Sequence, residues 1–174
     1  MPSISLKIRL QATNINLVGL TKTQVAKINR KVANQFIDIA ERHITPAIAN
    51  DNKIGVTGFR KIRIKKKRAL SRKGKGIASL WVGENDVLAQ FKKGTWKRTK
   101  EGAGKGNFFK KGAFVLPLST GKKLLVTREH GKLEAVRVPL HNYRTRVNQG
   151  VSKAQKGVLA SFNREVKIEL GKKK

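Results

Sequence analysis

The feature that most restricts how this chain can fold is a run of positive charge in its first half. Between Arg60 and Lys75, ten of sixteen residues are Lys or Arg, and no acid occurs between Asp51 and Glu84. Like charges at close range repel, so the run cannot pack against itself or enter a core. We therefore expect these side chains to face solvent or a partner of opposite charge.

The excess of positive charge extends over the whole chain. Lys and Arg number 40, against 10 Asp and Glu, for a formal net charge of +30. Solubility needs a net charge of only about 2–8 in a small domain. The balance therefore indicates a polyanionic partner, or acidic subunits around the protein.

Several classes of protein are excluded or disfavoured. The chain has no cysteine, which excludes disulfides and thiolate metal sites. No apolar run approaches the roughly 18 residues that span a bilayer, and no basic helix has a lipid-facing stripe, so we expect no membrane partner. The first twenty residues lack the apolar segment of a signal peptide. We also expect no cofactor.

Two helices are predicted, one near each end. The first begins at Thr21, which forms a capping-box pattern with Gln24. Pro46 is expected to help end it. Apolar residues recur at helical spacing in both segments: Val25, Ile28, Val32, Phe36 and Ile39 or Ala40 in the first, and Val151, Ala154, Val158, Phe162, Val166 and Leu170 in the second.

Short strands are predicted between and before these helices, at residues 3–10, 77–83, 87–91, 113–118, 123–129 and 133–138. Pro117 lacks a backbone donor, so its strand should lie at an edge or carry a bulge. The fold class is therefore α+β. We expect one domain over residues 1–174, with a small, mostly antiparallel sheet flanked by an N-proximal and a C-terminal helix.

Two basic segments are expected to project from this sheet. Residues 51–76 are predicted to be a loop or an extended hairpin, and residues 92–112 a second, glycine-rich loop. A flexible basic tail is the alternative for the first, but its internal position argues against that. With roughly 6–10 phosphate contacts, binding would weaken about 10³–10⁵-fold between 50 and 200 mM salt. The candidate contacts with nucleic acid or an acidic partner are Arg60, Lys61, Arg63, Lys65, Lys66, Lys67, Arg68, Arg72, Lys73, Lys75, Lys97 and Arg98.

Six aromatic residues lie near these cations, and bases could stack on them. We expect Trp81 and Phe91 to serve the core, because both fall within strand patterns. The role of Trp96, Phe108 and Phe109 stays open between loop anchoring and stacking. The stretch "EGAGKGN" at 101–107 lacks the spacing of a phosphate-binding loop, so we interpret it as a flexible loop.

Evidence for catalysis is weak. The three histidines, His43, His130 and His141, share no motif. Glu84 and Asp86 could hold a metal ion in a basic nuclease. An ordinary turn after a strand explains the same residues, and we prefer it. No catalytic residue is therefore assigned.

Three stretches of the chain resemble the minor tail protein Z family of long-tailed bacteriophages, also called tail completion proteins. "AKINRKVA" at 26–33 is similar to that family's N-terminal helix, with Asn29 and Arg30 as its Asn-Arg pair. A basic segment and a strand like "IASLWVG" follow in the same order. Residues 113–140 resemble the family's hairpin, in which a Val-x-Arg strand turns through Gly-Lys, here Gly131 and Lys132.

The resemblance implies a non-enzymatic virion protein of the phage tail or neck, assembled in the host cytoplasm. Such a protein completes the head-proximal end of the tail tube, helps it join the head and holds the genome end. The implied assembly is a ring, most plausibly a hexamer. The implied partners are the tail terminator, the tail tube proteins, the tape measure protein and viral double-stranded DNA.

Two other functions remain open from the residues alone. One is a ribosomal-type RNA-binding protein with basic arms, and the other is a metal-dependent nuclease. Under the tail hypothesis, reversing several charges within 60–68 should leave folding intact and impair genome retention or head joining. Either the DNA or an acidic segment of the tape measure protein could be what these charges contact.

Overall fold

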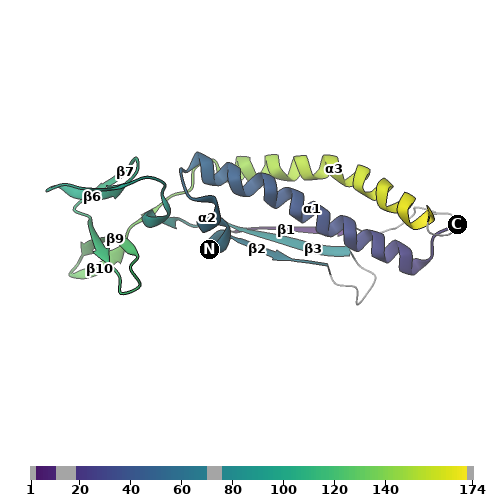
Figure 1. The fold of residues 1–174 in the computed structure, drawn as a ribbon, viewed down its shortest axis with the longest axis horizontal. Coiled ribbons are helices and arrows are strands. Elements are labelled where there is room, and N and C mark those ends of the chain that lie inside the picture. Colours follow the sequence, from purple (N-terminus) through teal and green to yellow (C-terminus); the bar gives the residue numbers. More distant parts are fainter. Residues whose placement is uncertain (1–2, 11–18, 70–75, 172–174) are drawn as a thin grey trace.

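The computed structural model describes residues 3–10, 19–69 and 76–171. Two long helices, α1 (Lys22–Asp51) and α3 (Tyr143–Gly171), run antiparallel along one side of a three-stranded antiparallel sheet (Figure 1). The sheet has the order β1–β3–β2, formed by β1 (Ser3–Leu10), β3 (Gly76–Gly83) and β2 (Ile64–Lys67). The predicted α+β class, with an N-proximal and a C-terminal helix beside antiparallel strands, is confirmed.

Helix α1 begins where its capping box predicts and ends later than expected. Thr21 accepts from the backbone N–H of Gln24, whose side chain accepts from Thr21 in return. The helix then passes Pro46 and ends at Asp51, so the predicted stop was wrong. Proline costs about 3 kcal/mol inside a helix. Burial of Ile44 and Ile48 on either side of it offsets that cost at about 1.5–3 kcal/mol each.

One face of the sheet packs against α1. Along β3 the side chains of Ala78, Leu80 and Val82 are buried, while the residues between them are more exposed. This alternation is expected for a strand with one covered face. In Figure 1 both long helices lie on the same side of the sheet. The opposite face, which we call the open face, therefore carries neither of the two long helices.

Helix α3 reaches the sheet only near its start and otherwise packs on α1. Its Tyr143 hydroxyl donates to the carbonyl of Val82. Further along, Gly150 lies directly against Ile44 of α1. Lys31 of α1 forms an ion pair of 2.8 Å with the buried carboxylate of Glu165 on α3. The predicted apolar stripe of α3 is correct at Ala154, which is buried, but Leu170 is exposed.

Residues 87–138 form a second unit with its own hydrophobic cluster, which we call the β-lobe. It contains a three-stranded sheet of β5 (Trp96–Arg98), β6 (Gly102–Lys105) and β7 (Phe108–Lys111). A second sheet joins β8 (Phe114–Pro117), β9 (Lys123–Glu129) and β10 (Lys132–Ala135). A short pair, β4 (Val87–Leu88) with β11 (Arg137–Val138), and a 3-10 turn η2 (Ala89–Phe91) complete it.

The β-lobe confirms some predicted strands and corrects others. β9 has the predicted bounds, and β8 lies at the edge of its sheet as Pro117 requires. The predicted strand 87–91 is only two residues of strand followed by the η2 turn. The predicted strand 133–138 divides into β10 and β11, which pair with different strands.

Neither basic segment is the loop that its composition suggested. Within 51–76, residues 56–63 form helix α2 (Val56–Arg63), and β2 pairs antiparallel with β3 as the hairpin alternative expected. Residues 70–75 lie outside the described part. Residues 92–112 contain β5, β6 and β7, so the loop predictions for 92–112 and 101–107 were wrong.

Glycine in β6 serves close strand packing. A Cβ on Gly104 would overlap the carbonyl of Phe108, and one on Gly102 would overlap that of Lys110. Only hydrogen fits where two backbones approach this closely. The glycine content of this segment therefore marks a closely packed sheet, whereas composition alone predicts a flexible loop.

Candidate nucleic-acid interface

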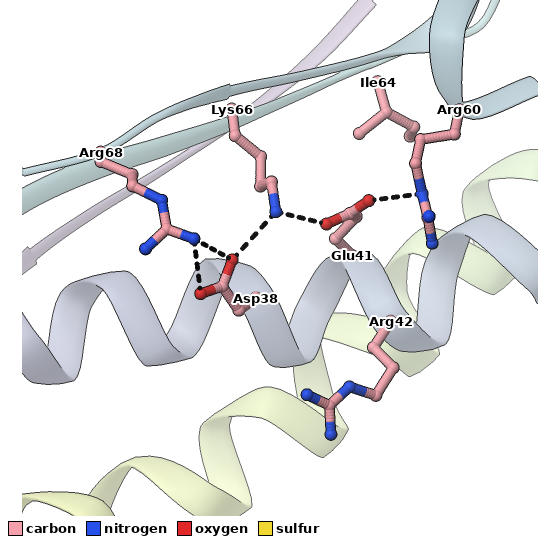
Figure 2. A pocket seen from close by; sticks show the side chains of 7 residues that line it. All are labelled: Asp38, Glu41, Arg42, Arg60, Ile64, Lys66 and Arg68. Carbon is pink, nitrogen blue, oxygen red and sulfur yellow. Dashed lines mark hydrogen bonds and ion pairs between the residues drawn. The ribbon is translucent and has the colours of Figure 1, made fainter. Parts of the chain in front are cut away.

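Three of the predicted contact residues face α1 and pair with its acids. Arg60 Nε lies 2.8 Å from Glu41, and Lys66 Nζ lies 2.7 Å from Glu41 and 3.0 Å from Asp38. Arg68 Nη2 lies 3.1 Å from Asp38. Figure 2 shows these five side chains as a continuous series of ion pairs, which we call the charge ladder. Three cations of the basic run therefore have acid partners within the chain, although the two carboxylates balance only two of the three charges.

The alternation of strand β2 creates the ladder. Ile64 is buried, and Lys66, two residues on, points to the same side. The hydrogen bond to Glu41, followed by that to Asp38, raises the pKa of Lys66 above its ordinary value, against the effect of burial. A pocket of about 420 Å³ lies here, and Arg42 lines it with its guanidinium turned away from both carboxylates (Figure 2).

The ladder changes what charge reversal should do. A glutamate at position 66 would face two carboxylates, one of them, Glu41, buried. An unpaired buried charge is strongly destabilising. The expectation that reversals within 60–68 leave folding intact therefore applies only to residues outside the ladder.

The remaining cations of the described run lie outside the ladder. Lys61, Lys65 and Lys67 are exposed, the first on α2 and the other two on β2. Arg63 is half-buried and donates from Nη2 to the Asp86 carbonyl at 2.5 Å. By alternation from Ile64 and Lys66, Lys65 and Lys67 belong to the open face.

Trp81 also lies on the open face, which corrects its expected place in the core. Its strand neighbours Leu80 and Val82 are the buried ones, and Trp81 is only half-buried. A Cβ on Gly83 would come within 2.6 Å of the indole, so the ring extends along the strand over that glycine. The Lys65 ammonium lies 5.3 Å from the ring centroid. An aromatic ring beside exposed lysines is a surface on which a base or a sugar can lie.

The other predicted contacts do not join this face. Lys97 and Arg98 are exposed on β5, in the β-lobe. β5 belongs to the same sheet as β6 and β7, which lies at the left of Figure 1. The start of α1 and the end of α3 lie at the opposite end of the molecule. Arg72, Lys73 and Lys75 fall outside the described residues. The structure thus separates two cationic surfaces, one on the sheet and one on the lobe.

The other aromatic residues mostly serve packing. Phe59 is fully buried in the main core. Phe91 packs against that core from η2, as predicted. Phe108 packs on the β-lobe cluster, whereas Phe109 is 43% exposed. Trp96 also packs on that cluster, and the Lys105 ammonium lies over its ring.

Acidic residues of the chain cannot neutralise these surfaces. Seven of the ten acids already form ion pairs, including Asp38, Glu41, Asp51 and Glu165. Even if all 10 acids were paired one to one with the 40 cations, 30 cations would have no acid partner. The cationic surfaces therefore call for an external anion.

Of the two residues considered for metal binding, Glu84 has another side-chain partner. Glu84 forms an ion pair of 3.3 Å with Arg144, whereas Asp86 accepts from Arg63 through its backbone carbonyl. Within residues 3–10, 19–69 and 76–171, no group of three or more His, Asp or Glu side chains is placed to hold a metal ion. Across the same ranges, no helix combines the length and the apolarity that crossing a bilayer requires.

Sequence reasoning missed the acids that organise the site. Asp38 and Glu41 lie three residues apart on the polar side of a predicted helix, a spacing that places both on one face. That spacing was the available signal, although nothing local linked it to residues 60–68. Comparisons with protein-family models, with curated proteins and with solved structures find no match to this chain.

Proposed function

We propose that the protein is a structural component of a phage virion, a tail completion or neck protein at the head-proximal end of the tail tube. The resemblance of residues 26–33 and 113–140 to the minor tail protein Z family motivates this function. One observation carries the polyanion-binding part: the chain has thirty more cations than acids. A rod of duplex DNA is the partner that best matches such a surplus.

The open face supports binding without base recognition. It presents Lys65, Lys67 and the edge of Trp81, and α1 shields its other side. Lysine contacts with phosphates position a protein on DNA and carry no sequence information. Such contacts hold duplex DNA of any sequence, which suits a protein that grips the end of a genome.

Repetition in a ring would multiply these contacts. Closed rings form from head-to-tail contacts between identical copies. In the proposed hexamer, six open faces would line one passage, and each copy would also contact the tail terminator, the tube or the tape measure protein. Among the described residues, β1 and β2 are the edge strands of their sheet, and edge strands offer backbone groups for such contacts.

The test is a charge reversal that spares the ladder. In the triple variant Lys61→Glu, Lys65→Glu, Lys67→Glu, duplex binding should weaken. The negative slope of log K against log salt should become shallower by up to about 2.7. The control reverses three exposed lysines of α3, Lys153, Lys156 and Lys167, and should bind nearly as the wild type does. Circular dichroism checks that both variants fold.

Assembly separates the tail function from its rival. Native mass spectrometry should find a closed ring in the tail case and a monomer on RNA in the ribosomal case. Particles carrying the first triple variant should lose packaged DNA or fail to join heads to tails. Equal DNA binding by the two triple variants, or normal particles from the first, would contradict the proposal.

A further inference from the structure

The β-lobe contains a second pocket, distinct from the charge ladder. It has a volume of about 420 Å³ and lies between η2, strands β5 and β6, and the turn that leads into β9. Its wall combines aromatic rings with amino groups. The lining residues are Gln90, Phe91, Trp96, Lys105, Gly121, Lys122 and Lys123.

The three lysines of this pocket face no acid in its wall. Lys105 Nζ donates to the Gln90 carbonyl at 2.7 Å and lies 5.1 Å from the Trp96 ring centroid. Burial lowers the pKa of Lys105, and no carboxylate is present in the lining to oppose that effect. Lys122 and Lys123 are exposed at the rim. An ammonium group has three donors, so this site has donor capacity left for an anion.

The lining combines an indole with amino groups. Trp96 is half-buried in the pocket wall, and Lys105, Lys122 and Lys123 supply donors for an anion. Together these groups match a nucleotide more closely than a bare phosphate.

We propose that this pocket binds an unpaired nucleotide of a nucleic-acid strand, with the base against Trp96 and the phosphates on Lys105, Lys122 and Lys123. A base inside a duplex is stacked on both faces and cannot offer its ring to an indole. An unpaired base can do so at a strand end or in a single-stranded stretch. The inference rests on the proposed function, since it assumes that the polyanion is a nucleic acid.

The two tryptophans of the chain, Trp81 and Trp96, allow DNA binding at the open face and at the pocket to be followed separately by tryptophan fluorescence. The Trp81→Phe variant leaves Trp96 as the only indole, and the Trp96→Phe variant leaves Trp81. Each is titrated with single-stranded oligothymidine and with a duplex of equal length. The ends of this duplex are closed by inert non-nucleotide linkers, so that it contains no unpaired base. Anisotropy of labelled DNA reports total binding at the same time.

We expect oligothymidine to quench Trp96 with saturation, and the closed duplex to bind without quenching it. The double variant Lys122→Ala, Lys123→Ala should lower the single-strand salt slope by about 1.4. Its affinity for oligothymidine should fall at least about fivefold. The control double variant Arg128→Ala, Lys132→Ala removes the same charge from exposed positions of the same lobe, outside the pocket lining, and should leave the quenching of Trp96 intact.

The outcomes separate this inference from the proposed function. If the closed duplex binds while Trp96 responds to neither DNA, or responds equally to both, the pocket does not take an unpaired nucleotide. The proposed DNA contact then still stands. Loss of quenching to the same extent in both double variants would also overturn the pocket. Absence of all DNA binding would contradict the proposed function itself. If Trp81→Phe fails to fold, the wild type and Trp96→Phe are compared instead. Quenching by oligothymidine should then be present in the wild type and absent from Trp96→Phe.

Discussion

Replacing Glu41 by Gln should make the protein less stable and at the same time a better binder of DNA. Glu41 is buried and accepts from Arg60 at 2.8 Å and from Lys66 at 2.7 Å. Glutamine keeps the shape but loses the charge and one acceptor oxygen. Because both cations are partly exposed, we expect unfolding to become easier by about 1–3 kcal/mol, less than for a fully buried pair.

The same substitution releases one cation, Arg60, from its acid partner. Each phosphate neutralised on duplex DNA contributes about −0.9 to the slope of log K against log salt. Freeing Arg60 should therefore steepen that slope by up to about 0.9, while Lys66 keeps its ion pair with Asp38. Urea unfolding followed by circular dichroism measures the first effect. Anisotropy of a labelled duplex at several salt concentrations measures the second.

Glu165→Gln is the matched control. Glu165 is also buried and also pairs with a lysine, Lys31, at 2.8 Å, but at the contact between α1 and α3. It should lose stability to a similar degree with no steepening of the salt slope. If the two variants steepen the slope equally, or if neither does, the ladder cations do not lie near bound DNA and the reasoning fails.

Two further predictions concern the contact between α1 and α3. Gly150→Ala should destabilise the fold by about 1–3 kcal/mol, because the added Cβ would overlap Ile44. Gly157→Ala should stabilise it by about 0.5–1 kcal/mol, because its Cβ would lie 3.5 Å from Ile39, an ordinary contact distance. Equal urea midpoints for the two variants would refute this. The second prediction concerns Asp51, whose pKa is lowered below 3.8 by its hydrogen bond with Arg146. The stability that this pair adds to the folded state is therefore present above pH 3.8 and is lost as pH falls through the folded-state pKa of Asp51. The stability difference between wild type and Arg146→Ala should therefore shrink below about pH 3.8 in acid titrations of unfolding, and a constant difference down to pH 2 would count against it.

Several elements were predictable because their signals are local. The capping residues Thr21 and Gln24 and the apolar spacing after them predict the start and the buried face of α1. Strict alternation predicts β1, and a short apolar run predicts β3. The end of α1 was not predictable, because burial of Ile44 and Ile48 against other elements outweighs the local effect of Pro46.

The candidate site was predicted only in part. Lys61, Lys65 and Lys67 are exposed as their charge requires. Trp81 was misplaced, because a short run with apolar residues on both faces does not reveal which face will be covered. The cationic pocket was missed altogether. Its lysines come from β6 and from the turn before β9, segments that only the folding of the β-lobe brings together.

By itself the sequence determined the α+β class, the capped start of the first helix and an excess of thirty positive charges, because composition and spacing between near neighbours suffice for these. Only the tertiary structure decided which cations are available to a partner. Lys66 and Arg68 meet Asp38 across 28 and 30 residues of chain. A carboxylate that distant in sequence stabilises a cation only once β2 lies over α1, so the division between paired and free charge is a property of the fold.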